Sequence, residues 1–460
     1  MVESTLSTRL ARLIRARPAG VGDLQLAERH VRDWLGAMAA GGATSAGRVL
    51  RSYAGERTDV EGRVFLAAAL SHITETDDLH RGSVTHPGCV VVPTAWLLGS
   101  ELGRRGHAVL HAVLAGYEAG LRIGEALGPG HYRVFHNTAT AGVFGAAAAA
   151  AQLLGLDEER WVWAFGSAGT QAAGLWQFNE DATMSKHLHA GHAAEAGLRS
   201  ALLAKGGFTG PGAILEGEKG FFRGLCPDPI PERVLAPAPG WKLQETSFKP
   251  YPSCRHTHAA IDAALEIRDR MLQAGDSPKA IAQLRIETYP AALRFTDNPA
   301  PVSTYAAKFS IQFCVATALV QGRPTLGAFD GEHLADASVR DPAARASVAV
   351  RDAFAEAYPA HWRSAVEVVT EAGRTYLAER DGARGDPEWP MMDQELDDKA
   401  RDLLAYGTMT PAASELMLRA CRQLVEDGPL PPLPWVAGAL PPAAFLKTLR
   451  RWARDATSSV

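Results

Sequence analysis

A dense run of glycine and alanine between His136 and His192 constrains the fold of this chain more than any other feature. The run opens with HNTATAGVFGAAAAAAQLLGL and closes with SKHLHAGH. Small side chains at this density allow helix backbones to approach one another closely, so the run predicts a crowded helical core rather than a surface bundle. Polar groups at the ends of such helices are well placed to converge on one pocket. We therefore expect the other segments to supply further walls and groups to that pocket.

The composition is that of an ordinary globular protein and argues against several functional classes. With 460 residues, 47% hydrophobic and 21% charged, the chain is long enough for two domains. Its formal net charge of -4, without a basic run, argues against a nucleic-acid partner. Its most apolar segments, such as Gly142 to Leu154, are too short to span a membrane. The sequence therefore predicts a protein without a nucleic-acid or membrane partner.

The cysteines and the N-terminal stretch bear on the cellular compartment. Five cysteines are scattered along the chain without a CxxC pair, which is typical of reduced thiols rather than a disulfide framework. The stretch MVESTLSTRLARLIRARPAG is amphipathic and lacks the long apolar core of a secretory signal. We therefore expect a cytoplasmic protein.

Hydrophobic periodicity predicts helices throughout the first part of the chain. Apolar residues recur at helical spacing in Leu24–Leu35 and Val60–Leu70. Two more helices are expected in Val90–Leu127, with a break near Gly103–Gly106. The polar segment 71–88 ends at a Pro–Gly pair and predicts a loop between two helices.

A change in composition over residues 210–252 marks a domain boundary. Glycine and proline become frequent there, which predicts irregular structure. Beyond it, residues 282–289 alternate like a strand, and residues 364–379 indicate a β-hairpin around a glycine. The helices expected in this part are Ala306–Gln321, Leu326–Leu334 and Pro342–Tyr358. From about Glu395 the pattern is helical again.

These patterns predict a mainly α protein with an α+β second domain. A large, discontinuous, all-helical domain would comprise residues 1–245 and 395–460. A smaller α+β domain, residues 246–394, would be inserted between its two parts.

The predicted loop after residue 71 concentrates groups suited to acid–base chemistry. Glu75, Asp78, His80 and His86 lie close together there. Neighbouring carboxylates and imidazoles shift one another's pKa values apart and can divide acid and base roles. The alternative interpretation is a solvated loop whose aspartates cap a helix.

Two further groups lie at the starts of small-residue helices. His136 precedes one helix, where the dipole favours a neutral imidazole that could act as a base or a hydrogen-bond donor; packing on the helix is the alternative. Lys186 is followed by His187, His189 and His192. This second group fits an anion-binding lysine with a supporting histidine, a zinc cluster or a solvated helix start. Because HExxH is absent, zinc ranks below the anion interpretation.

A basic cluster follows the domain boundary in a proline-rich turn. It contains Lys249, Arg255, His256 and His258. Cations around a turn bind carboxylates or phosphates well, although solvation at a domain edge gives the same pattern. Cys254 is a possible nucleophile without a dedicated base. Separate groups of cations and histidines therefore suggest a polycarboxylate site.

The chain resembles the MmgE/PrpD family in six segments that occur in the family's order. They are HPGCVVVPTAW, FHNTATAGVFGAAAAAAQLLGL, SKHLHAGHAAEAGLRSALLAKGGFTGP, KPYPSCRHTHAAIDA, AKFSIQF and GDPEWPM. The resemblance covers nearly the whole chain and is specific, because no single short motif carries it. It implies a large helical domain and a smaller α+β lid, in a homodimer without a metal or organic cofactor.

The resemblance also implies a set of site residues, matched position by position. Those with implied catalytic roles are Glu75, Asp78, His86, His136, Lys186, Lys249 and His258. Beside this set, the candidates for substrate binding are His80, His189, Cys254, Arg255 and Gln312. The chain departs from the family where ETDDL stands in place of DFDDT, where Asn137 replaces a common proline, and at Cys254, near which the decarboxylases have a histidine.

The implied activity is that of a cofactor-independent enzyme acting on a small di- or tricarboxylate. The two lysines would hold carboxylates and stabilise the charge that develops. Glu75, Asp78 or His136 would remove the proton α to a carboxylate. His86 or His258 would supply the acid. Dehydration of a citrate-like hydroxy acid is expected, and epimerisation or decarboxylation of a related polycarboxylate is the alternative. A zinc-binding hydrolase and a member that only binds carboxylates are the other classes.

Overall fold

The chain forms two compact units. The computed structural model describes residues 4–54, 57–181, 183–433, 447–452 and 454. Unit 1 comprises Met1–Ile73, Asp77–Thr246 and Met392–Val460. Unit 2 comprises Ser247–Met391 and a three-residue piece, Thr74–Thr76. The chain therefore enters unit 2 briefly after residue 73, well before its main passage through that unit.

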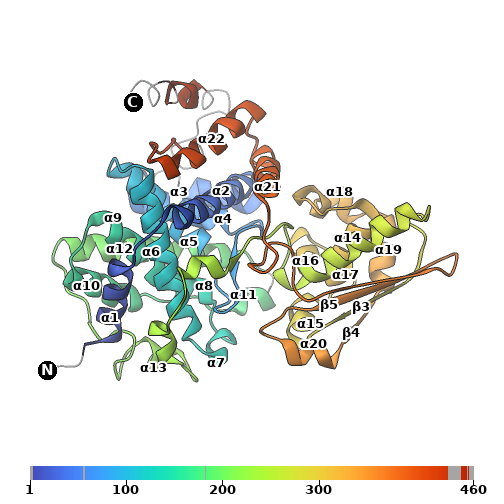
Figure 1. Cartoon of the computed structure of the whole chain (residues 1–460), viewed down its shortest axis with the longest axis horizontal. Helices are drawn as coiled ribbons and strands as arrows, with labels where there is room; N and C mark the ends of the chain where they lie inside the picture. Colours follow the sequence, from blue (N-terminus) through green and yellow to red (C-terminus); the bar gives the residue numbers. More distant parts are fainter. Residues whose placement is uncertain (1–3, 55–56, 182, 434–446, 453, 455–460) are drawn as a thin grey trace. The chain divides into compact units, whose positions relative to one another are not determined.

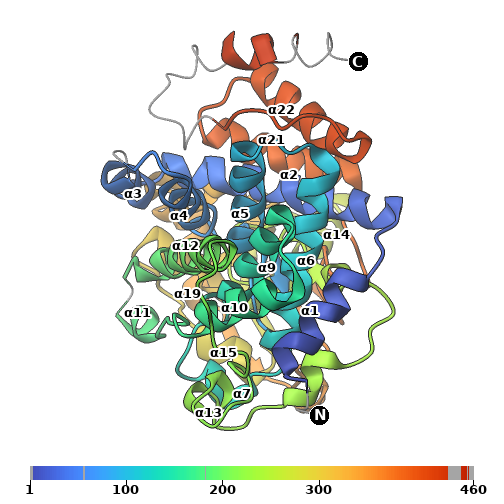
Figure 2. The same cartoon turned by 90° about the vertical axis from the view of Figure 1, so that its left-hand side faces the viewer.

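Unit 1 is built almost entirely of helices (Figures 1 and 2). Its helices are α1 (Leu6–Ala16), α2 (Val21–Ala43), α3 (Ser45–Ala54), α4 (Val60–Ser71), α5 (Gly88–Glu101), α6 (Gly106–Glu125), α7 (Pro129–Tyr132), α8 (Asn137–Thr140), α9 (Gly142–Leu154), α10 (Glu158–Gly169), α11 (Gln177–Glu180), α12 (Ser185–Lys205), α13 (Phe221–Leu225), α21 (Asp393–Tyr406) and α22 (Pro411–Gln423). The two-residue strand β1 (Leu79–His80) lies in the connection between α4 and α5, and β2 (Thr246–Ser247) lies at the junction with unit 2.

The glycine- and alanine-rich helices form the centre of unit 1, as the sequence predicts. Figure 2 places α9 between α6 and α12, and α9 contacts both. A Cβ atom on Gly197 of α12 would lie 2.5 Å from Ala146 Cβ and 2.5 Å from the Val143 carbonyl oxygen of α9. A Cβ on Gly145 would lie 2.9 Å from the Gly116 carbonyl oxygen of α6. Because such distances exclude any larger side chain, the small residues set the spacing of the three helices.

Polar pairs link the two sequence-distant parts of unit 1. Arg32 of α2 donates to Asp397 of α21 at 2.6 Å and contacts the Glu28 carboxylate at 2.7 Å. Lys399 of α21 donates to Asp33 of α2, and both side chains are buried. The last part of the helical unit is therefore held by buried ion pairs as well as by apolar contacts.

Unit 2 contains a four-stranded mixed sheet in the order β4-β3-β5-β6. Its strands are β3 (Ile281–Thr288), β4 (Ser347–Val350), β5 (Ser364–Thr370) and β6 (Thr375–Arg380), and its helices are α14 (His258–Gln273), α15 (Pro290–Thr296), α16 (Thr304–Lys308), α17 (Ile311–Gln321), α18 (Gly331–Leu334), α19 (Ala337–Arg345) and α20 (Asp352–Ala357). Ile286 of β3 is in register with Val348 of the parallel strand β4 and with Val366 of the antiparallel strand β5. Helix α14 packs on β5 and β6 (Figure 1).

The predicted strand at 282–289 and the hairpin at 364–379 are confirmed, but the three helices predicted in this part are each interrupted. Residues 326–334 form a 3-10 helix, Leu326–Phe329, followed by the short helix α18. The segment Pro342–Tyr358 is not one helix: α19 ends at Arg345, and residues 347–350 form β4 before α20 begins. These four residues gain their hydrogen bonds from β3, which is distant in sequence, so local periodicity does not reveal them. The predicted helix Ala306–Gln321 is divided into α16 and α17, because the Ser310 hydroxyl accepts a hydrogen bond from Phe313 N at 3.0 Å and caps α17.

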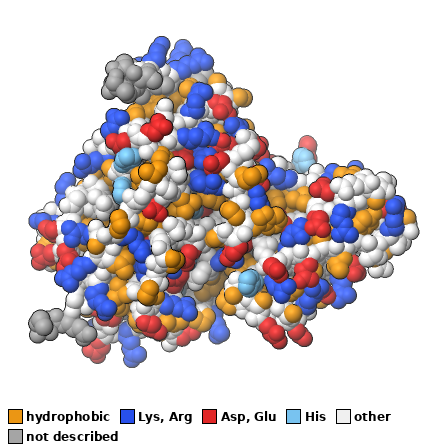
Figure 3. Space-filling model, viewed as in Figure 1, with side chains coloured by type: hydrophobic (Ala, Val, Ile, Leu, Met, Phe, Trp, Pro, Cys, Tyr) orange, Lys and Arg blue, Asp and Glu red, His pale blue; other side chains and the backbone are white. Residues whose placement is uncertain are grey.

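Among the described helices, none is long and apolar enough to cross a membrane. On the face drawn in Figure 3, Lys and Arg side chains are interspersed with Asp and Glu side chains and with hydrophobic ones. That face therefore lacks the concentrated basic patch typical of nucleic-acid binding.

Candidate acid–base site

Four histidines from separate segments of unit 1 come together in its interior. His72 caps the C-terminus of α4, His86 precedes α5, His136 caps the N-terminus of α8, and His189 lies in the first part of α12. The ring centroids of His72 and His86 are 5.0 Å apart, and the His72 and His136 rings stack at 5.4 Å. The His136 and His189 centroids are 5.5 Å apart. We call these four residues the imidazole cluster.

A buried aspartate orients one ring of the cluster. His72 Nδ1 lies 2.6 Å from Asp77 Oδ2, and both side chains are buried. An ionised carboxylate only accepts hydrogen bonds, so Nδ1 carries the hydrogen and Nε2 is left with its lone pair. His72 Nε2 is buried and has no hydrogen-bond partner among the described residues. A histidine held in one tautomer by a carboxylate, with its second nitrogen available, is the arrangement of a general base.

The neighbouring Asp78 holds the loop in place. Its carboxylate accepts hydrogen bonds from His30 Nδ1 at 2.7 Å, Tyr117 Oη at 2.6 Å and Gly88 N at 2.9 Å. Burial and this carboxylate raise the pKa of Tyr117 well above its usual value, so the phenol keeps its proton. The Asp78 carbonyl oxygen accepts a hydrogen bond from His86 Nδ1 at 2.7 Å. Asp78 therefore orients His86 through its main chain and anchors the loop through its side chain.

Two histidines of the cluster are neutral at pH 7. Burial lowers the pKa of His136 well below its usual value, and His72 and Lys186 lower it further. Burial and the neighbouring His72 lower the pKa of His189 to about 4. The two Nδ1 atoms lie 3.3 Å apart. Lys186 is buried in the first turn of α12, and its charge lowers the pKa of both rings, so its side chain lies near the imidazole cluster.

The predicted groups of unit 2 make buried contacts of their own. Lys249 Nζ lies 3.3 Å from Glu75 Oε2 and donates to the Glu75 carbonyl oxygen at 3.3 Å. Arg255 donates to the Asp386 carboxylate and to His258 Nδ1, the latter at 2.9 Å. His258 Nε2 therefore carries the hydrogen and donates to the Ser253 carbonyl oxygen at 3.2 Å. Arg255 and His258 thus connect parts of the turn that carries Lys249.

Three predicted substrate-binding residues contact groups outside the imidazole cluster. His80 Nδ1 lies 2.9 Å from Ser83 Oγ. Gln312 of α17 donates to Asp297 at 2.6 Å and so holds a turn of unit 2. Cys254 donates its main-chain N–H to the Lys308 carbonyl oxygen at 2.9 Å, and the residue is buried.

The geometry at possible metal ligands favours hydrogen bonds. Among the described residues, two sets offer three ligand atoms close together: His72, Asp77 and His86, and His80, Glu125 and Glu245. In the first set the 2.6 Å between His72 Nδ1 and Asp77 Oδ2 is a hydrogen-bond distance, whereas two ligands about 2.1 Å from one tetrahedral zinc lie about 3.4 Å apart.

In the second set a lysine takes the place of a metal cation. Lys242 Nζ lies 3.0 Å from carboxylate oxygens of both Glu125 and Glu245. Hydrogen bonds from His80 and Lys242 lower the pKa of Glu245 to about 2.

The three histidines after Lys186 do not form a metal set. His192 Nε2 donates to the Gln171 carbonyl oxygen at 3.1 Å, whereas His189 faces His136. Both sets of possible ligands in the described residues lack His187, His189 and His192. The zinc interpretation of that segment therefore has no support from its geometry.

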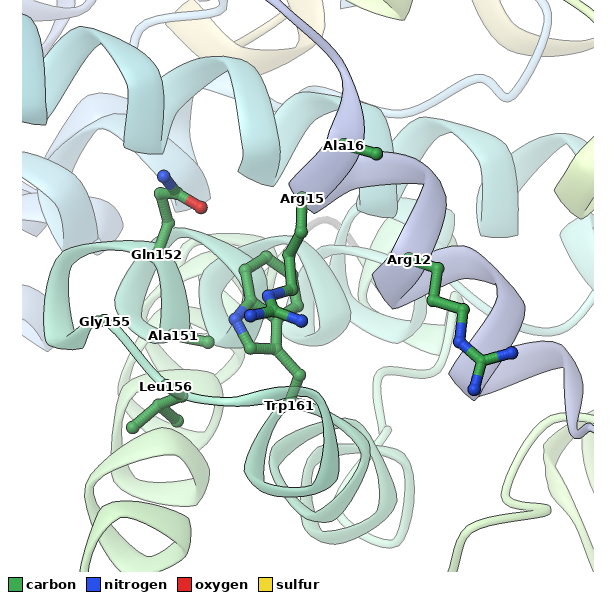
Figure 4. Close-up of a pocket in the computed structure, with 8 residues that line it drawn as sticks. All are labelled: Arg12, Arg15, Ala16, Ala151, Gln152, Gly155, Leu156 and Trp161. Carbon is green, nitrogen blue, oxygen red and sulfur yellow. The ribbon is translucent and has the colours of Figure 1, made fainter.

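A surface hollow of about 540 Å³ lies elsewhere on unit 1 (Figure 4). Its lining residues are Arg12, Arg15, Ala16, Ala151, Gln152, Gly155, Leu156 and Trp161. Arg12 donates to Glu158 at 2.7 Å and 2.8 Å, so its charge is matched. Because none of the eight carries an imidazole, a thiol or a carboxylate, the hollow offers no group for acid–base chemistry.

Sequence reasoning did not select the His72–Asp77 pair. Both residues belong to the predicted acidic loop, but the sequence predicts Glu75, Asp78 or His136 as the base. The available signal was the position of His72 directly after an apolar helical segment, five residues before Asp77.

The described chain consists of a helical unit and a smaller α+β unit. The helical unit carries a buried cluster of histidines, an aspartate and a lysine. The chain belongs to the MmgE/PrpD family: the family's N-terminal domain matches residues 19–233 and its C-terminal domain matches residues 251–424. The cis-aconitate decarboxylase of Homo sapiens is 29% identical, over 58% of this chain and 56% of that protein.

Two further relatives have a similar sequence identity to this chain. The cis-aconitate decarboxylase of Aspergillus terreus is 27% identical over 57% of each chain. The 2-methylcitrate dehydratase of Cupriavidus necator is 28% identical, over 41% of this chain and 40% of that protein. The chain thus spans little more than half the length of the cis-aconitate decarboxylases that it matches.

Proposed function

We propose that this protein catalyses a cofactor-independent reaction of a small di- or tricarboxylate that begins with removal of a proton α to a carboxylate. The observation that carries the proposal is the His72–Asp77 pair, whose Nε2 is buried without a hydrogen-bond partner among the described residues. A buried imidazole nitrogen without a partner is costly unless a ligand supplies one. The names of the relatives, a dehydratase and decarboxylases of tricarboxylates, support the substrate class.

Each group of the site has a role in this proposal. His72 takes the α proton on Nε2, and Asp77 stabilises the imidazolium that forms. Lys186 binds the carboxylate next to the reacting carbon and stabilises the negative charge that moves onto it. Neutral His136 donates a hydrogen bond to the same developing charge, as a histidine with a strongly lowered pKa can do.

In the dehydration, His86 supplies the acid. His86 Nδ1 is hydrogen-bonded to the Asp78 carbonyl oxygen, so Nε2 points away from Asp78. Nε2 is therefore the nitrogen that we propose as the proton donor. The C–H bond breaks, its proton moves to His72, the C–OH bond breaks, and the hydroxyl leaves as water with the proton from His86. Dehydration of a citrate-like hydroxy acid is therefore our first candidate reaction.

Decarboxylation of a cis-aconitate-like acid is the second candidate, because two of the relatives named above are cis-aconitate decarboxylases. In that reaction the C–CO2 bond breaks, carbon keeps the electron pair, and a protonated imidazole delivers a proton to it. Epimerisation would instead need a second proton donor on the opposite face of the carbanion.

Unit 2 contributes the remaining proposed groups. Lys249 is proposed as a further carboxylate-binding cation with Glu75 as its counter-ion, since the two form a buried pair. Arg255 and His258 are proposed to position that lysine, because their contacts hold the turn around it. Substitution of Lys249 by methionine is then expected to raise KM more than it lowers kcat.

We also propose a homodimer in the cytoplasm. Val134, Leu175, Met184 and Leu188 are between 50% and 57% exposed, in segments next to His136 and Lys186. Exposed apolar side chains in neighbouring segments support an interface with a second copy. All five cysteines are free thiols and buried, which supports a reducing compartment.

Proton NMR in D₂O of the metal-stripped protein with citrate, 2-methylcitrate and cis-aconitate tests the proposal. We expect deuterium at an α position or a new alkene signal, abolished by Lys186→Met and by His72→Gln. The exposed His333 provides a matched control, so His333→Gln is expected to leave the rate unchanged. Turnover that survives His72→Gln in a folded protein would refute the assigned base. Turnover that appears only after zinc is added would refute the cofactor-free reaction.

A further inference from the structure

The three-residue piece of unit 2 lies between the two members of the acid–base pair. His72 and Asp77 belong to unit 1, whereas Thr74, Glu75 and Thr76 group with unit 2. The hydrogen bond between His72 and Asp77 therefore closes a short loop whose middle consists of these three residues. Any displacement of that middle must be absorbed by Ile73 or by the pair itself.

Two buried lysines of unit 2 hold the main chain of this piece. Lys308 Nζ donates to the Thr74 carbonyl oxygen at 3.0 Å, and Lys249 Nζ donates to the Glu75 carbonyl oxygen at 3.3 Å. The side chains of both lysines are buried, and so are Thr74 and Glu75. Hydrogen bonds from a charged donor to a buried carbonyl are stronger than neutral ones, so these two contacts fix the path of the loop.

The path that they fix is a strained one. Glu75 has a φ of +59°, in the left-handed region that side chains other than glycine rarely occupy. Such a conformation persists only where the surroundings determine it. The hydroxyls of Thr74 and Thr76 are hydrogen-bonded to each other at 2.7 Å across the strained residue, which adds to the support from the two lysines.

Lys308 also connects this loop to the turn that carries the basic groups. It is the last residue of α16, and its own carbonyl oxygen accepts the Cys254 N–H at 2.9 Å. One residue thus joins the loop before Asp77 to the segment that begins at Lys249.

We propose that Lys308 is a positioning residue: by holding the Thr74 carbonyl, it keeps the loop in the conformation in which Asp77 meets His72 Nδ1. Lys308 acts on the reaction through the loop and leaves substrate binding to other groups. The kinetic consequence rests on the function proposed above, whereas the consequence for the His72–Asp77 hydrogen bond does not.

The test compares Lys308→Met with the wild-type protein. Lys279 of unit 2 is exposed, so Lys279→Met is the matched control for loss of one charge. The readouts are the low-field Nδ1 proton signal of His72, assigned with His72→Gln, and amide hydrogen exchange over residues 73–77. Steady-state kinetics on the carboxylate panel give kcat and KM separately.

We expect Lys308→Met to abolish the low-field signal and to accelerate exchange over residues 73–77. A misplaced base lowers kcat by about 100-fold while KM changes by less than about threefold. Lys308→Arg keeps a charged donor and is expected to restore part of the low-field signal and part of kcat. Lys308→Gln keeps a neutral N–H donor on a shorter side chain and serves if Lys308→Met does not fold, with smaller changes of the same kind.

An unchanged signal and unchanged exchange in a folded Lys308→Met protein would overturn the proposal. So would a loss that Lys279→Met reproduces. If the signal and exchange change as expected but the wild-type protein transforms none of the acids, the proposed function fails and the positioning role stands.

Discussion

The close contact between α12 and α9 gives a stability prediction that can be worked out atom by atom. In Gly197→Ala the new Cβ would lie 2.5 Å from both Ala146 Cβ and the Val143 carbonyl oxygen, and 2.8 Å from the Ala147 nitrogen. All three are main-chain or Cβ atoms of α9 and have no side-chain rotation available. The helices must therefore move apart by several tenths of an ångström.

The expected cost is the difference between two effects. Overpacking of this kind costs about 1–3 kcal/mol, and here the upper half of that range applies because the contacts are with rigid groups. Alanine gains back about 1 kcal/mol over glycine in a helix interior. The net loss of unfolding free energy is then about 1–2 kcal/mol. Because Lys186 and His189 lie on α12, the same shift is expected to lower kcat/KM by about tenfold or more.

The matched control is Gly22→Ala on the exposed side of α2, where a Cβ meets nothing within 4 Å. It gains the helix propensity without the clash, so we expect stabilisation by about 0.5–1 kcal/mol. Urea unfolding followed by circular dichroism measures both variants. Equal stability of the two variants would show that the small residues do not set the helix spacing.

Three further predictions concern the site, the pH dependence and the assembly. Asp77→Asn leaves His72 without its orienting carboxylate and is expected to lower kcat by about 1,000-fold or more with the fold intact; near-normal turnover would contradict the assignment. Burial lowers the pKa of His256 to about 3 from a usual value near 6.5, so the stability linked to it is complete above pH 6.5 and is lost as the pH falls from 6.5 towards 3. The slope of unfolding free energy against pH between 6 and 4 should therefore be smaller in His256→Phe, by up to about 1.4 kcal/mol per pH unit, and equal slopes would refute the burial argument. Leu188→Glu places a charge in the exposed apolar patch and is expected to yield monomers in sedimentation velocity; an unchanged mass would place the interface elsewhere.

The sequence predicts those parts of the fold that depend on local periodicity. The helices of unit 1, strand β3 and the hairpin of β5 and β6 follow from patterns of period 3.6 or 2 within each segment. Strand β4 is not predicted in this way, because its partner β3 lies about sixty residues earlier in the chain. Its four residues are too few to show a hydrophobic alternation of their own.

In the site, too, the features that depend on neighbouring residues are predictable, whereas contacts between residues distant in sequence are not. His136 and Lys186 stand at helix starts, as their neighbours in the sequence indicate. Which aspartate orients a histidine depends on the path of an irregular loop, and no periodicity encodes it. The partner of Arg255, Asp386, lies 131 residues away, so a basic cluster that looks free in the sequence is buried in an ion pair.

The discontinuity of unit 1 has a consequence for how the protein is made. Arg32 and Asp397 are 365 residues apart in the chain, so a ribosome must translate all of Ser247–Met391 before α21 exists to cover α2. Until then the nascent helical unit exposes the face of α2 that carries Arg32 and Asp33, with neither ion pair formed. Synthesis of α21, rather than emergence of the first helices, is therefore the step that allows the acid–base unit to be completed.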